Sequence, residues 1–403
     1  MYQYKKLATL ILTASIIAGL TPIHIVPAQS VTAEQTKAVP ETISEISTEP
    51  EATAQPVTEQ PAIPEPTTTE FIQSTLSPVK AKTIVLDPGH CNKHRGASCA
   101  GLREERVVLD IAKACKNELD QYGDINVYMT RTSNKCPQSI APGDCLIARN
   151  YFSKLLRADS LISMHIDFDK GSGAKILVPY KSGYNDSVRK KSRKLGSKIL
   201  TELHNIGLKN KGFLLRKSSK YVRYKNGKRA DYYSIVRNGV KLNIPSIIIE
   251  HGYINRASER NKYFRTKQQR ITVGTADAKA IISYYNLSAR TISGNFSKIG
   301  SNMYYVTDTS QKVRGWVKSE GKWYYFDETT GKMKKGFVTI GKNTFYFKPS
   351  TGEMTVGWFK VKGSTYLSRG NGTLVKNQKY SDGYYKYTFN AKGKRLKKIS
   401  RVK

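Results

Sequence analysis

Beyond its opening segment, the 403-residue sequence lacks any apolar stretch that could span a bilayer, which takes about 20 apolar residues. That segment has Lys5 and Lys6 before an apolar run from Leu7 to Leu20, followed by the small-residue site at 26–28. A charged start, a short apolar run and a cleavable small-residue site are typical of a secretory signal peptide. We therefore expect residues 1–28 to be a signal peptide and the protein to be secreted, with no transmembrane segment.

Acidic residues are also scarce, because 31 Asp and Glu face 67 Lys and Arg, a formal net charge of +36. Residues 29–80 hold eight of the Glu and only two Lys, among Thr, Pro, Ala and Gln with scattered apolar residues. Such a segment cannot bury enough apolar surface to offset its ordering entropy, so we expect a disordered linker. Residues 81–403 then carry about +40.

A positive field of that strength favours polyanions. For an intracellular protein, nucleic acid would be the first candidate. For an exported protein, the candidates are anionic wall polymers, acidic glycans or a membrane surface. A solvated basic face without a specific partner stays open as well.

Cysteine is rare, and all five cysteines lie between Cys91 and Cys145. Export permits disulfides, and the local pairs Cys91–Cys99 and Cys136–Cys145 would each close a short loop. Cys115 would then stay free. Sequence alone does not prove this connectivity, so the pairing is an expectation.

Short apolar runs alternate with helical patterns across residues 81–287. The runs are TIVLD (83–87), INVYMTR (125–131), SLISMHI (160–166), AKILVPY (174–180) and SIIIEHG (246–252). Most are apolar on both faces, as in strands that helices cover on each side. Helical spacing marks residues 104–123, with Cys115 on the apolar stripe, and residues 186–207. The pattern predicts an α/β domain with a twisted, mostly parallel sheet and helices on both faces.

A composition rich in Tyr, Gly, Lys and Trp follows a short linker at residues 288–297. Three Gly–aromatic pairs recur every 21 residues: Gly315–Trp316, Gly336–Phe337 and Gly357–Trp358. A fixed period indicates stacked supersecondary units rather than a second globular core. Aromatic alternation closed by a Gly turn makes each unit a β-hairpin. We therefore expect residues 298–403 to form a repetitive β-hairpin solenoid.

Four candidate catalytic residues fall at one edge of the predicted sheet. His90 follows the first apolar run, His165 and Glu250 end two others, and Glu104 begins the first helix. Functional groups gather at the carboxyl ends of the strands in such sheets. Two His and one carboxylate make a catalytic zinc set with a fourth position for water, and Glu250 would be free to move a proton. From spacing alone, structural roles stay open, because strand-end His and buried Glu are usually structural.

Five motifs together resemble one family: TIVLDPGH, GLREERVVLDIA, TRT with the following Arg149, ADSLISMHID and PSIIIEHGYINRASE. Over residues 82–286 the chain is similar to the zinc-dependent N-acetylmuramoyl-L-alanine amidases of the type 3 class. These enzymes cleave the amide between the lactyl group of muramic acid and the L-alanine of the peptide stem. The resemblance implies His90, Glu104 and His165 as ligands of Zn²⁺. It implies Glu250 as the carboxylate that deprotonates the attacking water and protonates the leaving amine.

Other His and acidic residues near these motifs are not expected to bind the zinc. The family pattern assigns the ligand to Glu104 rather than to its neighbour Glu105. His251 should point to the opposite face of its strand from Glu250. We also take His94, in a Gly-containing loop, and His204, in the basic helix, as non-ligands.

The sequence departs from the family pattern at two positions near the zinc. Asp167 stands where Asn is usual, and Cys91 follows His90 where a Gly pair is common. A Cys91 thiolate could become a fourth zinc ligand and close the open position. A disulfide between Cys91 and Cys99 would prevent this, and we expect that disulfide.

The hairpin units resemble the aromatic wall-binding repeats of choline-binding and glucan-binding proteins. In choline-binding members, cages of Trp and Tyr hold a quaternary ammonium by cation–π attraction. The resemblance implies five cage residues: Trp316, Trp323, Tyr325, Tyr346 and Trp358. Phe337 and Phe345 replace Trp at two positions, and Lys residues crowd the hairpins. Two alternatives stay open, namely aromatics that only pack hairpins together, and an anionic teichoic polymer or glycan as the ligand.

These observations predict a secreted, cell-wall-associated peptidoglycan hydrolase. Its expected partners are peptidoglycan and, through the repeats, an anionic wall polymer or a choline-bearing teichoic acid, but not nucleic acid. Two other functions remain as alternatives. One is a wall-binding protein whose zinc site is closed and inactive, and the other is a zinc peptidase that cuts within the stem peptide.

Overall fold

The computed structural model describes residues 70–137, 142–381, 385–396 and 400–401. The predicted signal peptide, and the predicted linker as far as residue 69, lie outside the described residues. All the described residues belong to one compact unit. In the described part of the chain, no helix is both long and apolar enough to cross a membrane.

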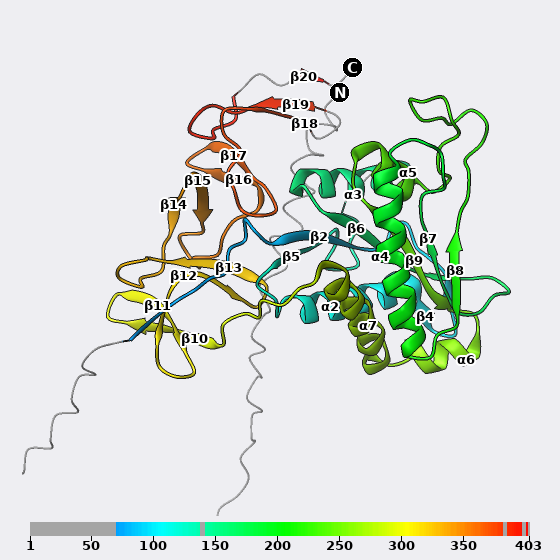
Figure 1. The fold of residues 1–403 in the computed structure, drawn as a ribbon, viewed down its shortest axis with the longest axis horizontal. Helices are drawn as coiled ribbons and strands as arrows, with labels where there is room; N and C mark the ends of the chain where they lie inside the picture. The colour runs from blue at the N-terminus through cyan, green and yellow to red at the C-terminus, as the bar shows by residue number, and fades with distance from the viewer. Residues whose placement is uncertain (1–69, 138–141, 382–384, 397–399, 402–403) are drawn as a thin grey trace, which may run out of the picture. The chain divides into compact units, whose positions relative to one another are not determined.

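A six-stranded sheet forms the centre of the first domain (Figure 1). In spatial order its strands are β5 (Ile125–Met129), β2 (Lys82–Pro88), β6 (Ser160–Asp167), β9 (Ser246–Tyr253), β7 (Ala174–Leu177) and β8 (Asn210–Leu214). Neighbouring strands pair in parallel except β7 and β9, which are antiparallel. The prediction of a mostly parallel sheet is therefore confirmed.

Helices cover both faces of this sheet, as predicted. One face packs against α2 (Glu104–Leu119), α4 (Asp186–Asn205) and α7 (Lys267–Tyr285), and the other against α3 (Pro142–Leu156) and α5 (Ser234–Leu242). Successive strand residues point to opposite faces. Ile84 and Leu86 therefore join the first core, whereas Val85 joins the second. Burial on both sides explains why the strands are continuous apolar runs.

Shorter elements complete this domain. β3 (Ser98–Cys99) and β4 (Leu102–Arg103) form a small hairpin before α2. Helix α6 (Ala257–Glu259) and a π-helical turn (Arg260–Phe264) follow β9. β8 is absent from the predicted strands because its sequence, NKGFL, is half polar and the strand lies at the sheet edge.

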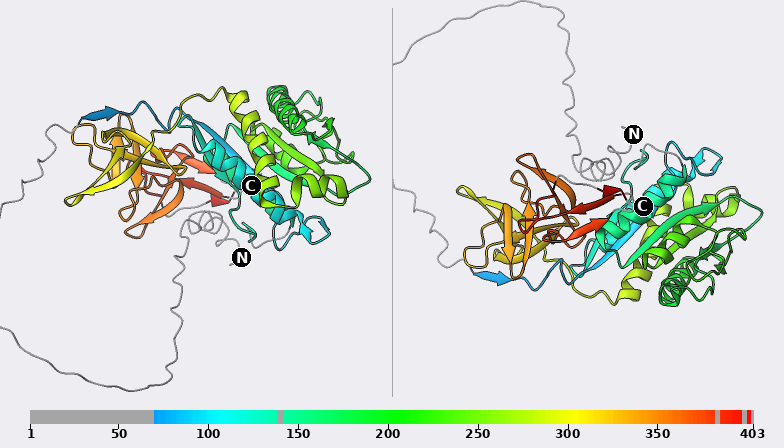
Figure 2. Two further views of the ribbon diagram at one scale, coloured as in Figure 1. Left: turned by 90° about the horizontal axis from the view of Figure 1, so that it is seen from below. Right: turned by 90° about the horizontal axis from the view of Figure 1, so that it is seen from above.

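Successive β-hairpins form the repeat region, coloured yellow to red in Figures 1 and 2. They are β10 (Gly294–Ile299) with β11 (Asn302–Thr307), β12 (Lys312–Ser319) with β13 (Lys322–Phe326), β14 (Gly336–Ile340) with β15 (Asn343–Phe347), β16 (Gly357–Val361) with β17 (Ser364–Ser368), and β18 (Lys379–Ser381) with β19 (Tyr385–Thr388) and β20 (Ser400–Arg401). Gly315, Gly336 and Gly357 have φ values of 83°, 75° and 83°, a left-handed backbone that favours glycine. This requirement accounts for the 21-residue recurrence of glycine in the sequence.

A backbone hydrogen bond joins each hairpin unit to the one before it. The donor and acceptor pairs are Met333 N to Met303 O, Met354 N to Trp323 O, Leu374 N to Thr344 O, and Arg395 N to Thr365 O, all at 2.7 or 2.8 Å. Their nearly constant spacing repeats the sequence period. Contacts between neighbouring units are the defining feature of a solenoid, so that prediction is also confirmed.

The end of the predicted linker differs from the expectation of disorder. β1 (Phe71–Gln73) pairs in parallel with β12 of the repeats. The Arg314 guanidinium lies 3.6 Å from the centre of the Phe71 ring, and Leu76 is buried beside Trp316. A few apolar residues among polar ones suffice here, because the hairpins supply the apolar surface and the strand edge that the linker itself lacks.

Candidate active site

Three side chains converge at the carboxyl ends of β2 and β6. His90 Nε2 lies 3.2 Å from Glu104 Oε1, and His165 Nδ1 lies 3.0 Å from the same oxygen. The three possible ligand atoms all lie within 4.8 Å of one another. At zinc–ligand distances of about 2.0–2.1 Å, tetrahedral geometry separates two ligand atoms by about 3.3 Å. The structure thus brings His90, Glu104 and His165 together in a set that fits zinc.

Charge and hydrogen bonding prepare Glu104 for this role. Burial would raise the pKa of Glu104, but hydrogen bonds and charge from His165 and His90 hold that pKa well below its usual range. The backbone N–H groups of Ala97 and Ile166 donate to its two oxygens at 2.9 and 3.1 Å. Burial also lowers the pKa of His165. An ionised carboxylate and neutral imidazoles are the forms that bind a metal.

Two glycines leave room for the ligands. A Cβ atom on Gly89 would lie 2.3 Å from Cε1 of His165, and one on Gly96 would lie 2.2 Å from Oε2 of Glu104. Between them, His90 has a φ of 58°, in the left-handed region that non-glycine residues seldom adopt. Such backbone conformations persist where the surroundings impose them, commonly at functional sites.

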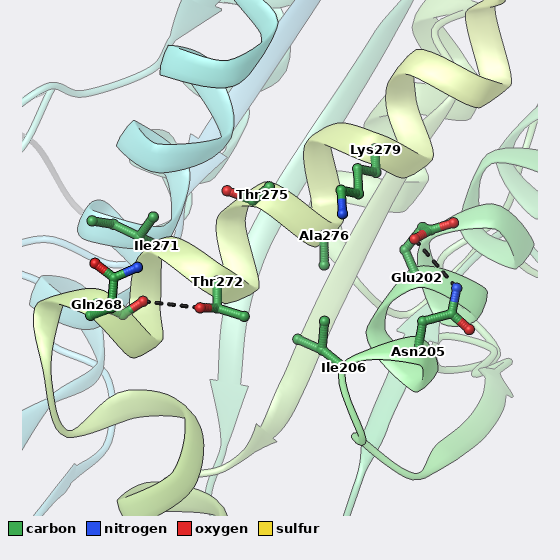
Figure 3. A pocket seen from close by; sticks show the side chains of 9 residues that line it. All are labelled: Glu202, Asn205, Ile206, Gln268, Ile271, Thr272, Thr275, Ala276 and Lys279. Atoms are coloured by element: carbon green, nitrogen blue, oxygen red, sulfur yellow. Dashed lines mark hydrogen bonds between the residues drawn. The ribbon is translucent and has the colours of Figure 1, made fainter.

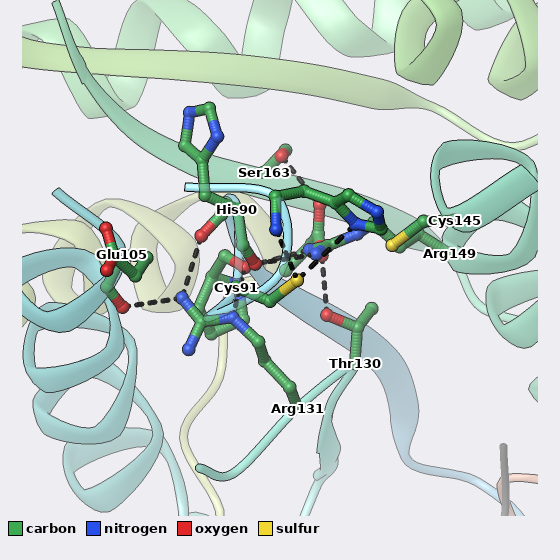
Figure 4. A network of polar contacts seen from close by, with 12 residues as sticks. His90, Cys91, Glu105, Thr130, Arg131, Cys145, Arg149 and Ser163 are labelled. Atoms are coloured by element: carbon green, nitrogen blue, oxygen red, sulfur yellow. Dashed lines mark hydrogen bonds and ion pairs between the residues drawn. The ribbon is translucent and has the colours of Figure 1, made fainter. Parts of the chain in front are cut away.

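Two buried arginines hold the loop that carries His90 (Figure 4). Arg149 Nη2 donates to the carbonyl oxygen of His90 at 2.8 Å. Arg131 Nη2 donates to the carbonyl oxygens of Gly89 and Glu105, each at 2.7 Å. The loop that carries His90 and the start of α2 are thereby fixed to each other. Both arginines belong to the same sequence motif, because Arg131 is the Arg of TRT and Arg149 is the arginine that follows it.

Glu250 lies on β9, in register with His165 on the adjacent parallel strand β6. Paired residues of parallel neighbours project to the same face of the sheet, so Glu250 lies beside the zinc set. Burial, followed by the charges of Glu104 and Asp167, raises the pKa of Glu250 well above its usual range, and Lys175 opposes the shift. A buried carboxylate with a raised pKa can take and return a proton near neutral pH.

Lys175 is a residue near the site that the motifs do not reveal. On β7 it is in register with Glu250, and it forms an ion pair with Asp167 and donates to Tyr253 Oη at 3.0 Å. Asp167, the departure from the usual Asn, therefore has a cationic partner. Lys175 escapes sequence analysis because its place depends on the antiparallel pairing of β7 with β9.

The rival residues are engaged elsewhere. Glu105 accepts a hydrogen bond from Arg103 Nε at 2.6 Å. His251 is fully buried on the other face of the sheet, with Nε2 at 2.8 Å from Oδ2 of Asp277. His204 lies on α4, where its ring contacts a backbone carbonyl. None of these side chains is grouped with His90, Glu104 and His165 as a possible metal ligand.

The expected disulfides Cys91–Cys99 and Cys136–Cys145 are absent from the structure, where no two cysteine sulfurs lie at disulfide distance. Cys99 Sγ contacts the Arg260 guanidinium at 3.5 Å, whereas Cys91 turns to the ring of His94. Cys136 and Cys145 approach to 3.7 Å between sulfurs, far beyond a disulfide bond of about 2.05 Å. Tertiary contacts thus override the pairing suggested by proximity in sequence. Cys91 belongs to a second group of side chains and not to the His90 set.

Comparison with known proteins decides the family. The family model for N-acetylmuramoyl-L-alanine amidases matches residues 84–283. Residues 293–336 match a choline-binding repeat, and residues 335–354 match a cell wall binding repeat. The chain contains a domain of the N-acetylmuramoyl-L-alanine amidase family. Cell-wall-binding repeats follow this amidase domain.

Individual relatives match the amidase domain. The endolysin of Bacillus phage SPP1 is 25% identical over 180 residues, 44% of this chain and 57% of the relative. The "Probable cell wall amidase LytH" of Staphylococcus saprophyticus is 28% identical over 212 residues, 52% of this chain and 60% of the relative. The chain thus spans less than two thirds of either relative. A solved structure, Cwp6 from Clostridium difficile, is 27% identical with a TM-score of 0.42, covering 51% of this chain and 30% of that one.

The five predicted cage residues of the repeats fall into two groups. Trp316, Trp323 and Tyr325 are only 3–6% exposed and pack in one core cluster with Phe345 and Phe347. Trp323 Nε1 also donates to Asn126 Oδ1 at 2.7 Å. Trp358 is half-buried and packs against Tyr387 and Phe389. For these four residues the structure supports the packing alternative, since most of each side chain is already covered.

The fifth predicted cage residue, Tyr346, belongs to a more open aromatic cluster. Its ring lies 4.7 Å from that of Phe337 and stacks on that of Phe359 at 4.9 Å, between centroids. Tyr366 completes the group, 5.0 Å from Phe337, which is 43% exposed. We call Phe337, Tyr346, Phe359 and Tyr366 the open aromatic cluster. Of the other three members, Phe337 occupies a Gly–aromatic repeat position but replaces the Trp expected of a cage, and Phe359 and Tyr366 lie outside the repeated pairs.

A pocket of about 390 Å³ lies between α4 and α7 (Figure 3). Its lining mixes apolar Ile206 and Ala276 with polar side chains such as Glu202 and Lys279. Neither the zinc set nor Glu250 contributes to it, so this pocket is separate from the candidate active site of the amidase domain.

Proposed function

We propose that the protein is a secreted peptidoglycan hydrolase that cleaves the amide between N-acetylmuramic acid and the L-alanine of the stem peptide. The observation that carries this proposal is the convergence of His90, Glu104 and His165, with Glu250 on the adjacent strand. Three protein ligands and a nearby carboxylate are the components of a catalytic rather than a structural zinc site.

In this proposal, His90, Glu104 and His165 would hold a zinc ion, which would supply Lewis acidity for the scissile carbonyl and for the attacking water. Glu250 accepts the proton of the attacking water and returns it to the nitrogen of the leaving L-alanine. Its burial favours that cycle, because a carboxylate in a dry setting is readily protonated. Arg131 and Arg149 hold the His90 loop, so that the first ligand does not depend on a mobile turn.

In the alternative of an inactive wall-binding protein, a Cys91 thiolate would be the fourth zinc ligand and would occupy the position that water needs. The Cys91 sulfur lies 3.5 Å from Nδ1 of His94 and is grouped with that ring rather than with His90. Cys91 would therefore not be a ligand of a zinc ion held by His90, Glu104 and His165, which favours an enzyme over a binding protein.

Mass spectrometry of the products tests the bond that is cut. Purified walls treated with the protein should release intact stem peptides that begin with alanine, and a zinc chelator should abolish the release. Fragments with a cut inside the stem would instead identify the zinc peptidase alternative. Absence of any release by the zinc-loaded protein would support the wall-binding alternative.

We propose that the repeats hold the enzyme in the cell wall. The open aromatic cluster offers faces for a quaternary ammonium, such as choline of a teichoic acid. The strong positive charge also suits an anionic wall polymer. Retention on walls stripped of teichoic acid, compared with retention on intact walls in the presence or absence of free choline, separates these ligands.

A further inference from the structure

A second group of metal-binding side chains lies beside the candidate active site and has no role in the mechanism above. Cys91, His94 and Cys136 place their ligand atoms within 4.8 Å of one another. The measured separations are 3.5 Å from Cys91 Sγ to His94 Nδ1 and 3.8 Å from Cys136 Sγ to the same nitrogen. Cys145 Sγ lies 3.7 Å from Cys136 Sγ.

These separations match the edges of a zinc tetrahedron. With Zn–S of about 2.3 Å and Zn–N of about 2.0–2.1 Å, tetrahedral geometry places two sulfurs about 3.8 Å apart and a sulfur and nitrogen about 3.5 Å apart. A disulfide would instead require about 2.05 Å between sulfurs. The two sulfur–nitrogen distances therefore lie near the tetrahedral value, and the one sulfur–sulfur distance, 3.7 Å, agrees with a shared metal rather than with a disulfide.

The surroundings already shape the cluster as a site. The His94 N–H points to Cys91 Sγ at 3.4 Å, and the Cys91 N–H donates to the His94 carbonyl oxygen at 3.0 Å. Asn92 connects the loop that carries His90 to the loop after β5, because its Oδ1 accepts a hydrogen bond from Cys136 N at 3.1 Å. Backbone N–H donors to ligand sulfur and hydrogen bonds that orient ligands are typical of built metal sites.

Burial and charge are also consistent with thiolate ligands. Cys91 and Cys145 are 0% and 2% exposed. Two buried guanidinium groups act on these sulfurs, that of Arg131 on Cys91 and that of Arg149 on Cys145. Three thiolates and one imidazole on Zn²⁺ carry a net charge of −1, which these cations offset.

We propose that Cys91, His94, Cys136 and Cys145 bind a second, structural zinc ion. A closed set of three Cys and one His leaves no position for water, so this ion takes no part in hydrolysis. It ties the loop that carries His90 to the loop after β5 and to α3. His90 directly precedes Cys91, so the structural ion steadies the first ligand of the catalytic set.

Metal content of the full chain tests the proposal without any measurement of hydrolysis. We expect two zinc ions per chain in the wild type and one in Cys136→Ser. Cys99→Ser is the matched control, because Cys99 lies outside the cluster, and it should keep two. His165→Ala should lose only the catalytic ion, so this variant should also contain one zinc ion per chain.

Cobalt substitution identifies which site each ion occupies. Thiolate ligands give Co²⁺ a sulfur-to-metal charge-transfer absorption, which the His90 set cannot produce. The band should be present in the wild type, Cys99→Ser and His165→Ala, and absent in Cys136→Ser. Its absence from the wild type, or a zinc content of one in the wild type, would overturn the proposal.

Thiol reactivity of the wild type keeps the test valid if Cys136→Ser does not fold. With zinc bound, Cys91, Cys136 and Cys145 should resist alkylation, and chelation should expose all three to the reagent. Peptide mass spectrometry that finds Cys136 joined to Cys145 by a disulfide would contradict the proposal. Because His165→Ala removes only the catalytic ion, failure of this proposal and failure of the proposed hydrolysis are distinguishable.

Discussion

Asp87 and Arg149 form a buried ion pair beneath the His90 loop. Burial alone would raise the pKa of Asp87, but the charge of Arg149 and hydrogen bonds from Thr130 and Ser163 outweigh it and lower that pKa. The same guanidinium binds the carbonyl of His90. One residue thus compensates a buried charge and positions His90, the proposed zinc ligand.

Replacing Arg149 by Met should destabilise the protein by about 3–5 kcal/mol, because it leaves Asp87 buried without a partner. Urea unfolding monitored by circular dichroism measures the change. Lys198→Met, at an exposed position of α4, should differ from the wild type by less than about 0.5 kcal/mol. An Arg149→Met variant as stable as the wild type would contradict the role of Arg149 as the partner of a buried, ionised Asp87.

The same pair predicts a dependence of stability on pH. In the wild type the folded pKa of Asp87 lies below its unfolded value, so its contribution is present above pH of about 4 and is lost as the pH falls further. In Arg149→Met, burial should raise the folded pKa instead, so this variant loses stability as the pH rises above about 4. The difference in unfolding free energy between the two proteins should therefore be larger at pH 7 than at pH 3. An equal difference at both pH values would count against a buried, ionised Asp87.

Among individual residues, the sequence predicts the set of His90, Glu104, His165 and Glu250, but it does not predict the cluster of Cys91, His94, Cys136 and Cys145. His90, His165 and Glu250 follow predicted strands, and the rule that functional groups gather at strand ends brings them together. Cys91 and Cys136 are separated in the chain by β3, β4, α2 and β5, and their approach depends on how two loops fold at the ends of β2 and β5. Sequence proximity instead favoured disulfide pairs that do not form.

At the scale of elements, the aromatic side chains of the hairpins divide into a buried and an exposed set. Trp316 is 6% exposed and packs against Trp323 and Phe345, whereas Phe337 at the equivalent repeat position is 43% exposed. The aromatic side chain at this repeat position is therefore part of the core in one unit and exposed on the surface in the next.

Matched substitutions separate these two roles. Trp316→Ala should lower the unfolding free energy by about 3–5 kcal/mol, since it removes a large buried side chain. Phe337→Ala should change it by less than about 1 kcal/mol but reduce retention on purified walls. Calorimetry and a wall-pelleting assay measure the two effects. Normal retention of Phe337→Ala would exclude the open aromatic cluster as the wall-binding surface.

Element prediction succeeds where one periodicity dominates. The continuous apolar runs of β2, β6 and β9 and the 21-residue hairpin period are visible in the sequence because each reflects burial or a turn. β1 and β8 lack such signals, since both lie at sheet edges and depend on a neighbour for their hydrogen bonds. The antiparallel direction of β7 follows from the short connection 168–173, which returns the chain directly after β6.

On the scale of the whole molecule, positive charge dominates: the net charge is +36, and residues 81–403 alone carry about +40. Attraction of such a chain to an anionic wall is screened as salt shortens the Debye length from about 10 Å at 0.1 M to about 3 Å at 1 M. Retention on purified walls should therefore fall steeply over this range. Retention unchanged by salt would show that aromatic stacking, and not charge, holds the protein in the wall.

The central claim is that zinc and Glu250 together hydrolyse the amide, and Glu250→Gln tests it most directly. The variant should retain its full zinc content but release alanine-terminated stem peptides from walls about 10²–10⁴-fold more slowly, because the proton acceptor is lost. Glu202→Gln, in the separate pocket between α4 and α7, is the control and should match the wild type. Release by zinc-loaded Glu250→Gln at the wild-type rate would contradict the account.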